Sequence, residues 1–138
     1  MNYKMRDRAK TISKEDYLEA ILVCTKKLGA CRVTDIAGHM GHSKASVSVA
    51  LSKLENEGLI VKDDWRILLS DKGKTIAEKV LERHLFFLKW FEHIGIDTET
   101  AKEDACLIEH VISDSTFEKI RQYITENDEV LLGAYNKN

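Results

Sequence analysis

The sequence predicts a mainly α-helical protein, in which an N-terminal winged helix-turn-helix is followed by an all-helical C-terminal half. Three observations predict this fold class. The chain has no proline and only seven glycines, so breaks between helices are few. Apolar residues repeat at helical spacing over most of the chain. The exception follows Gly58, where a short apolar run and a charged stretch replace the helical period.

The first half contains the pattern of a helix-turn-helix. We expect a helix over residues 13–28, with Ser13 as its N-cap. A short amphipathic helix over residues 33–40 ends at a glycine, and Ser43 caps a third helix over residues 44–57. Two short helices with a glycine in the turn between them, the second opened by a serine cap, are typical of this DNA-binding motif.

A β-hairpin is expected next, followed by helices only. The apolar run 59–61, a charged tip at 62–64 and the stretch 65–69 predict the wing of a winged helix. Ser70 or Asp71 then caps a long helix. The remaining helices are expected at residues 71–95, 98–112 and 115–125, with a last short helix near 130–135.

The composition indicates a cytoplasmic globular protein. Hydrophobic residues make up 43% and charged residues 32% of the chain, and the net charge is −2. No apolar stretch approaches the roughly 20 residues that span a membrane, and Met1 does not begin an export signal. Cys24, Cys31 and Cys106 are an odd set at unrelated spacings, so we expect free thiols rather than a disulfide framework.

The third helix has the side chains that reading a major groove requires. Small polar residues occupy its first turns and are expected to face outward, whereas Val47 faces the core. A serine-rich surface on an ordinary helical hairpin is the alternative, but serines inside a helix lower its propensity. We therefore expect DNA contacts from Ser43, Lys44, Ala45, Ser46, Ser48, Lys53, Lys62 and Arg66.

Candidate metal ligands lie near the end of the chain. Cys106, Glu109 and His110 fall within about 100° of one helical face. A thiolate, a carboxylate and an imidazole suit Fe(II), Zn(II), Co(II) or Mn(II), although a structural cysteine beside an exposed Glu–His pair is an equally good interpretation. His84 occupies a position in an apolar stripe, where a core histidine is the alternative to a ligand.

Two carboxylates on the first helix complete the candidate set. Asp16 and Glu19 are one turn apart and share a side of the helix. Asp16 has a simpler explanation, because an acid near a helix N-terminus is stabilised by the helix dipole. Each residue alone is a weak indication of a metal site. Together they supply more potential ligands than ordinary surface residues would explain.

In its combination of motifs, the sequence resembles the diphtheria-toxin-repressor family of iron- and manganese-dependent repressors. The resemblance runs from about Ser13 to Tyr123, and the chain is similar to the short manganese transport regulators. The matching features are Asp16 and Glu19, the helix-turn-helix, the wing ending in Leu69-Ser70-Asp71-Lys72-Gly73, Arg83-His84, and Cys106-x-x-Glu109-His110.

The resemblance implies a metal centre formed by Asp16, His84, Cys106 and Glu109, and a second centre that uses Glu19 and His110. Cys106 departs from the manganese branch, which carries a glutamate there, and matches the iron branch. A thiolate favours softer ions, so Fe(II) or Mn(II) is expected, with Zn(II) or Co(II) possible in vitro.

The expected function is that of a metal-dependent repressor of metal-uptake genes. A DNA-binding domain of residues 1–73 and a metal-binding and dimerisation domain of residues 74–138 would form a homodimer on a palindromic operator. Metal binding would select the spacing of about 34 Å between two recognition helices. The aromatic residues Phe86, Phe87, Trp90 and Phe91 offer apolar area for the dimer contact or for the core.

Two other functions are compatible with the sequence. A winged-helix regulator sensing an organic ligand or an oxidant could use one of the cysteines, provided that its thiol is exposed and has a lowered pKa. A metalloenzyme would need an open coordination position beside a substrate cleft. The chain has no glycine-rich phosphate loop and no nucleophile elbow, so we expect neither an enzyme nor an organic substrate.

Overall fold

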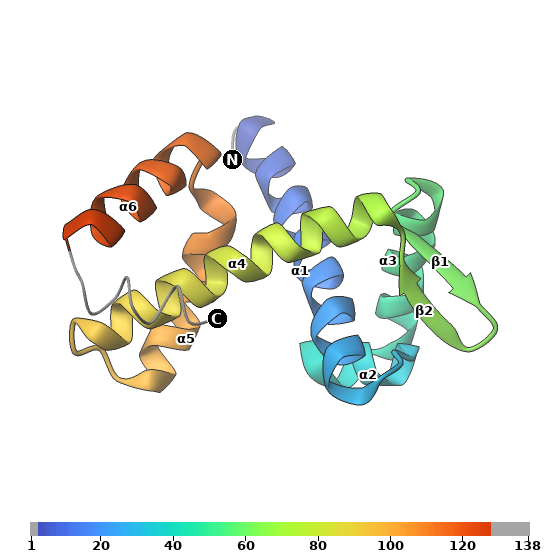
Figure 1. Cartoon of the computed structure of the whole chain (residues 1–138). Coiled ribbons are helices and arrows are strands. Elements are labelled where there is room, and N and C mark those ends of the chain that lie inside the picture. Colours follow the sequence, from blue (N-terminus) through green and yellow to red (C-terminus); the bar gives the residue numbers. More distant parts are fainter. Residues whose placement is uncertain (1–2, 128–138) are drawn as a thin grey trace. The chain divides into compact units, whose positions relative to one another are not determined.

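The computed structural model describes residues 3–127, with side chains described from residue 13 onward. The described part is mainly helical, with one antiparallel hairpin (Figure 1). Its elements are α1 (Tyr3–Leu28), α2 (Val33–Met40), α3 (Lys44–Asn56), β1 (Ile60–Asp63), β2 (Arg66–Leu69), α4 (Asp71–His93), α5 (Thr98–Val111) and α6 (Asp114–Asn127). They form two compact units, Met1–Val80 and Leu81–Asn138, and the division falls within α4.

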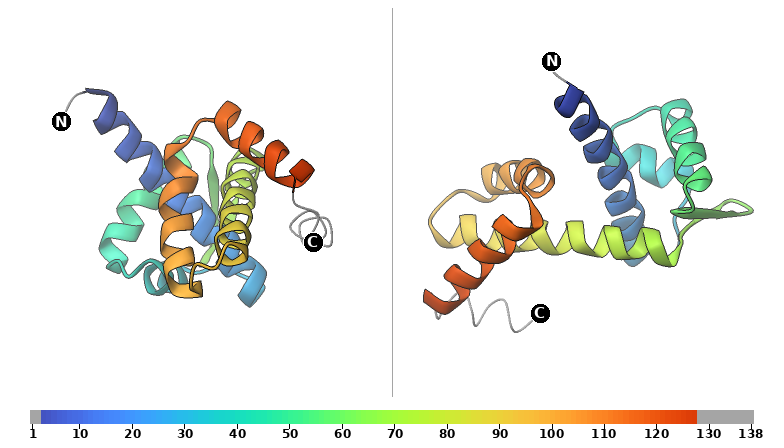
Figure 2. Two further views of the ribbon diagram at one scale, coloured as in Figure 1. Left: turned by 90° about the vertical axis from the view of Figure 1, so that its left-hand side faces the viewer. Right: turned by 90° about the horizontal axis from the view of Figure 1, so that it is seen from above.

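The first unit is a winged helix. Helix α1 packs against α2, α3 and β2, and α3 packs against α2 and β1. The hairpin projects beyond these three helices (Figure 2). The core of the first unit consists of apolar side chains that the helical period places on the inner faces of the helices. These side chains include Leu18, Ile21, Ile36, Val47 and Leu51, each fully buried.

Local turn chemistry fixes where the helix-turn-helix begins and ends. Gly41 ends α2 with φ 67°, a left-handed conformation that glycine adopts without steric cost. Ser43 caps α3, because its Oγ accepts the backbone N–H of Ser46 at 3.1 Å. The predicted cap at Ser43 is therefore confirmed.

The first helix begins earlier than the sequence suggested. Ser13 lies inside α1 and is not its N-cap. The preceding stretch from Tyr3 to Ile12 contains Lys, Arg, Met and Ala and has neither glycine nor proline, so nothing in it ends a helix. Asp16 is therefore well inside α1, and the helix dipole no longer explains it.

The wing has a shorter tip than expected. Ile60 pairs with Leu69 and Asp63 with Arg66, so Lys62 and Asp63 belong to β1 and the turn is Asp64–Trp65. The expected charged tip at 62–64 is wrong, because the tight turn lets the charged residues pair as strand neighbours. Asp64 adopts φ 56°, which aspartate tolerates better than most residues.

Ser70 joins the wing to α4. Its Oγ accepts the backbone N–H of Gly73 at 3.1 Å and donates to the carbonyl of Gly58 at 2.6 Å. Ser70, rather than Asp71, is thus the capping side chain. A Cβ at Gly73 would collide with the carbonyl of Leu59, so only glycine fits this close approach.

The second unit has an aromatic core. Phe86 and Phe87 of α4 pack with Ala105 of α5 and with Phe117 and Ile124 of α6. Both phenylalanines are at most 1% exposed, so they belong to the core and not to a dimer contact, whereas Trp90 and Phe91 are only partly buried.

The last predicted helix, near residues 130–135, lies outside the described residues. Within the described residues, no helix is long and apolar enough to cross a membrane.

Candidate metal centre and nucleic-acid interface

Three candidate ligands meet in the helical unit. The two carboxylate oxygens of Glu109 face two different imidazoles: Oε2 lies 2.9 Å from His84 Nδ1, and Oε1 lies 3.1 Å from His110 Nε2. Glu109 is 1% exposed, and the His110 side chain is 2% exposed. A charged residue is rarely buried in this way unless it is paired or binds a metal.

The sequence of α5 explains why Glu109 is buried. Ala101, Ala105 and Glu109 are spaced four residues apart and form the buried face of the helix. The small alanines let the backbone of α5 approach its neighbours closely, and Ala105 packs in the aromatic core with Phe86 and Phe87. Glu109 therefore continues an apolar stripe, and its carboxylate is carried inward next to His84.

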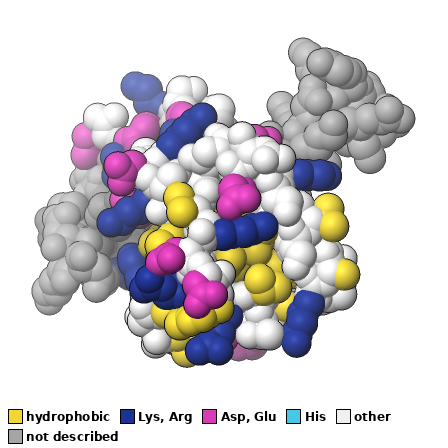
Figure 3. All heavy atoms as spheres, turned by 90° about the vertical axis from the view of Figure 1, so that its right-hand side faces the viewer, with side chains coloured by type: hydrophobic (Ala, Val, Ile, Leu, Met, Phe, Trp, Pro, Cys, Tyr) yellow, Lys and Arg dark blue, Asp and Glu magenta, His cyan; other side chains and the backbone are white. Residues whose placement is uncertain are grey.

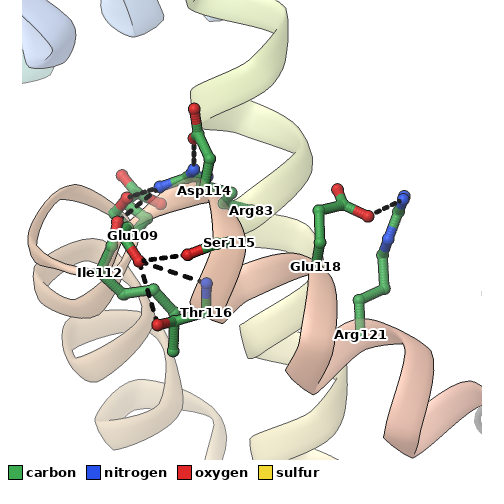
Figure 4. A network of polar contacts seen from close by, with 9 residues as sticks. Arg83, Glu109, Ile112, Asp114, Ser115, Thr116, Glu118 and Arg121 are labelled. Carbon is green, nitrogen blue, oxygen red and sulfur yellow. Dashed lines mark hydrogen bonds and ion pairs between the residues drawn. The ribbon is translucent and has the colours of Figure 1, made fainter.

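Arg83 holds the end of α5 in place. This side chain is 7% exposed and donates to the carbonyls of Glu109 at 3.3 Å and Ile112 at 3.0 Å. It also pairs with Asp114 (Figure 4). Its guanidinium lies over the ring of Phe117, 5.1 Å from the ring centroid. A cation is favourable at a helix C-terminus, where the last carbonyls lack partners within the helix. Arg83 thereby links the turn that contains Glu109 to α4 and α6.

The sequence interpretation gave Arg83 no role of its own. The available signal was its position, since residues 83 and 84 both fall between Val80 and Phe87 on the apolar stripe of α4. Two polar residues in one such gap indicate that one is buried with partners.

The remaining candidate ligands differ in exposure. Asp16 and Glu19 lie one turn apart on α1, are both half-buried, and have carboxylate oxygens within 4.8 Å of each other. Cys106 lies on α5 one turn before Glu109 and His110, and it is exposed.

The donor set around Glu109 fits a divalent transition ion. Carboxylate oxygens and imidazole nitrogens suit Mn(II), Fe(II), Zn(II) and Co(II). Two adjacent ligand atoms, each about 2.1 Å from one ion at a right angle, are about 3.0 Å apart. The distances of 2.9 and 3.1 Å from the Glu109 oxygens to the two ring nitrogens are those of imidazole–carboxylate hydrogen bonds, and they are also compatible with this spacing.

The two cysteines of the winged helix have no features of a reactive site. Cys24 is 5% exposed and Cys31 is fully buried. Burial raises the pKa of Cys24, and it raises the pKa of Cys31 to about 12. Both thiols are therefore protonated at neutral pH and are poor nucleophiles.

The recognition helix α3 presents the residues that were expected to contact DNA. Lys44, Ala45, Ser46 and Ser48 are exposed, whereas Val47 is buried. On the face of the molecule that carries the wing, Lys and Arg side chains surround a group of hydrophobic ones, with some carboxylates between them (Figure 3).

Two cations near the wing have partners within the protein. Lys62 donates to Ser52 Oγ at 3.3 Å and so links β1 to α3. Arg66 pairs with Asp63 across the hairpin, which offsets its charge.

The sequence interpretation missed Arg32. Its guanidinium lies 4.1 Å from the ring centroid of Trp65, a cation–π contact that stabilises the turn of the wing.

Tyr17 connects α1 to the helix-turn-helix. Its hydroxyl lies 2.9 Å from Nδ1 of His42, the residue before the cap of α3. Tyr17 directly follows the candidate ligand Asp16, so the same turn of α1 bears a candidate ligand and a contact to the start of the recognition helix.

These features define a winged-helix DNA-binding protein with a candidate metal centre in its helical unit. The N-terminal DNA binding domain of iron-dependent repressors matches residues 11–66, and their metal binding and dimerisation domain matches residues 70–129. The chain belongs to this family of iron-dependent repressors, whose members are metal-dependent transcriptional regulators and not enzymes.

Individual relatives agree with this family. The HTH-type transcriptional regulator MntR of Bacillus pumilus is 32% identical over 123 residues, which are 86% of this chain and 85% of the relative. The structure of the manganese regulator SloR is 29% identical with a TM-score of 0.69, and that of ScaR with bound Zn²⁺ is 32% identical with a TM-score of 0.64. Each match covers 80% of this chain and 53% of the solved chain.

Proposed function

We propose that this repressor binds a palindromic operator as a homodimer when it is loaded with Mn(II) or Fe(II), and that it represses metal-uptake genes in the cytoplasm. The observation that carries the proposal is the buried carboxylate of Glu109 between the imidazoles of His84 and His110. Such a group is costly to bury unless its charge is compensated, and a divalent ion compensates it.

The proposed ligands form two groups around Glu109. Asp16, His84, Cys106 and Glu109 would hold one ion, and Glu19 and His110 would hold a second one together with Glu109. Two features support a carboxylate shared between two ions: Oε2 of Glu109 faces His84, and Oε1 faces His110. A bound divalent ion supplies the positive charge that allows several carboxylates to approach one another.

The metal preference depends on Cys106. Oxygen and imidazole ligands suit Mn(II), whereas a thiolate favours Fe(II), Co(II) or Zn(II). Among the similar proteins, one is described as a manganese regulator and another was solved with Zn²⁺. We therefore propose Mn(II) or Fe(II) as the physiological ion, with Zn(II) and Co(II) as substitutes in vitro.

The proposed division of labour assigns DNA binding to residues 1–73, and metal binding and dimerisation to residues 74–138. Asp16 and Glu19 lie on α1 of the winged helix, so metal ligation by them would connect the two activities. Tyr17 supports this coupling, because its contact to His42 leads from α1 to the cap of α3. We propose Ser43, Lys44, Ala45, Ser46, Ser48, Lys53, Lys62 and Arg66 as the DNA contacts, and no organic substrate.

An anaerobic titration tests the proposal. Apo protein is titrated with Mn(II), Fe(II) and Zn(II) while its affinity for operator DNA is followed, with His84→Ala and Cys106→Ala variants in parallel. We expect the metal to raise the affinity of the native protein by at least tenfold, as is usual for coupled sites, and both variants to lose this response while remaining folded. Variants with an unchanged metal response would show that the ligand assignment is wrong.

The same titration separates the rival functions. A regulator that senses an oxidant would release DNA on peroxide treatment of metal-free protein. Cys106 is then the thiol to test, since it is exposed while Cys24 and Cys31 are buried. A Cys106→Ala variant that keeps its metal response but loses sensitivity to peroxide would favour this rival.

A further inference from the structure

In its first two turns, the recognition helix has only one side chain of the kind that forms paired hydrogen bonds with bases, Lys44. Arg, Lys, Asn, Gln, Glu and Asp read bases in the major groove by such bonds. Helix α3 has no Arg, Gln or Asp, and its Glu55 and Asn56 are its last two residues. Lys44 is the one charged residue in its first two turns. The helix therefore has few ways to distinguish bases by hydrogen bonding.

The same face presents apolar groups instead. Val49 is 60% exposed, although valine is more often buried and lowers helix propensity through its β-branch. Ala45 is exposed one turn earlier, so the two side chains are neighbours on the outer surface of α3. Val47, Leu51 and Leu54 already form the buried face of the helix, so Val49 is not required for the core.

The chemistry of this pair matches one feature of the major groove. Thymine carries a C5-methyl group there, and small apolar side chains recognise it by contact. Flanking Ser48 and Ser52 are exposed and small, so they leave the methyl groups of Val49 accessible. Lys44 and Lys53 are exposed on the same helix and provide attraction to phosphates near such a contact.

We propose that Val49 and Ala45 determine operator specificity by contacting thymine methyl groups, so that each half-site contains thymines opposite α3. The proposal rests on the proposed binding of operator DNA and adds what that DNA must contain. Val49 lies in the middle of the helix and provides the larger apolar surface, so it accounts for most of the discrimination.

Removing the methyl group from the DNA tests the proposal directly. Preferred duplexes are first selected from random sequences with metal-loaded protein, and each thymine of a half-site is then replaced by deoxyuridine, which lacks only the methyl group. We expect at least one replacement per half-site to weaken binding about fourfold, the loss of one buried methyl contact. No weakening at any thymine overturns the proposal.

Variants identify the side chain responsible. Val49→Ala should bind the thymine duplex more weakly and lose most of its discrimination between thymine and deoxyuridine at one position. Val111→Ala is the matched control, because Val111 is 57% exposed but lies on α5 of the other unit. It should keep the ratio of the two affinities. Equal discrimination by Val49→Ala and the native protein overturns the role of Val49.

The first step also separates this proposal from the proposed function. Metal-loaded protein that enriches no DNA sequence would contradict operator binding itself. Protein that enriches a sequence, but binds its deoxyuridine form equally well, would leave operator binding intact and overturn only the reading of methyl groups.

Discussion

The two units differ in how their functional residues relate to their cores. In the winged helix, the candidate DNA contacts are exposed on α3 and the wing, while a separate set of apolar residues holds the fold. In the helical unit, Glu109 is itself buried, in line with Ala101 and Ala105 and beside the aromatic core. The proposed DNA contacts are therefore separable from the core of the first unit, whereas the proposed ligand Glu109 is part of the buried interior of the second.

The largest effect is expected from the aromatic core. Phe87→Ala should lower the free energy of unfolding of the helical unit by about 3–5 kcal/mol, because it leaves a large cavity among packed rings. Trp90 lies 6.2 Å from Phe87 between ring centroids, and its fluorescence during urea unfolding, measured in a Trp65→Phe background, reports on this unit. Leu85→Ala is the control, since Leu85 is 45% exposed. An equal loss of unfolding free energy in the two variants would contradict the assignment of Phe87 to the core.

Metal binding should respond next most strongly. Glu109→Gln keeps the shape of the side chain but removes its charge, so metal affinity should fall more than about 100-fold, which is about 2.7 kcal/mol. Calorimetric titration measures the affinity, and circular dichroism checks the fold. Glu103→Gln changes an exposed glutamate on the same helix and should leave the affinity unchanged. An unchanged metal affinity in Glu109→Gln would show that this buried carboxylate is not needed for metal binding, and the contrast between the two units would then be wrong.

The free energy of unfolding of the winged helix should fall at alkaline pH because of Cys31, a core residue that is not among the proposed DNA contacts. Burial raises the pKa of Cys31 from 9.0 to about 12, so the folded protein keeps a proton that the unfolded chain releases. This stability is present below pH 9 and is lost as the pH rises toward 12, by at most about 1.4 kcal/mol per pH unit. Unfolding measured between pH 8 and 11 should show a shallower decline in Cys31→Ala. An identical decline would show that Cys31 is not the cause.

The smallest effect concerns the cap of the recognition helix. Ser43→Ala should destabilise the winged helix by about 1 kcal/mol, because the N–H of Ser46 loses its acceptor. Ser43→Asp should restore most of this stability, since aspartate is an equally good cap. Ser48→Ala, at an exposed position inside α3, should change the stability by less than about 0.5 kcal/mol. Thermal unfolding distinguishes these outcomes.

The winged helix was predictable because its signals are local. The cap at Ser43, the glycine at the end of α2 and the loss of the helical period after Gly58 each act within a few residues. The errors were also local: Ser13 has the right chemistry for a cap, but no helix breaker precedes it. The hairpin tip was misplaced because register depends on which residues pair across the strands.

The candidate ligands were named from their spacing and from the family resemblance, but the sequence did not show their environment. Helical periodicity puts Glu109 and His110 on one side of α5 and His84 on a stripe of α4. It does not tell whether a polar residue in such a stripe is buried with partners or exposed. The burial of Glu109 and the contacts of Arg83 come from residues about 26 positions apart in the chain.

The sequence by itself determined the helices, the wing, the serine-faced recognition helix and the residue types suited to a transition metal, because periodicity and capping are local properties. Only the tertiary structure decided that Glu109 faces two imidazoles, that Arg83 holds the end of α5, and that Val49 is exposed at the middle of α3. These three facts depend on which helix faces pack together. That choice minimises the apolar area exposed by the whole unit, which no local pattern encodes.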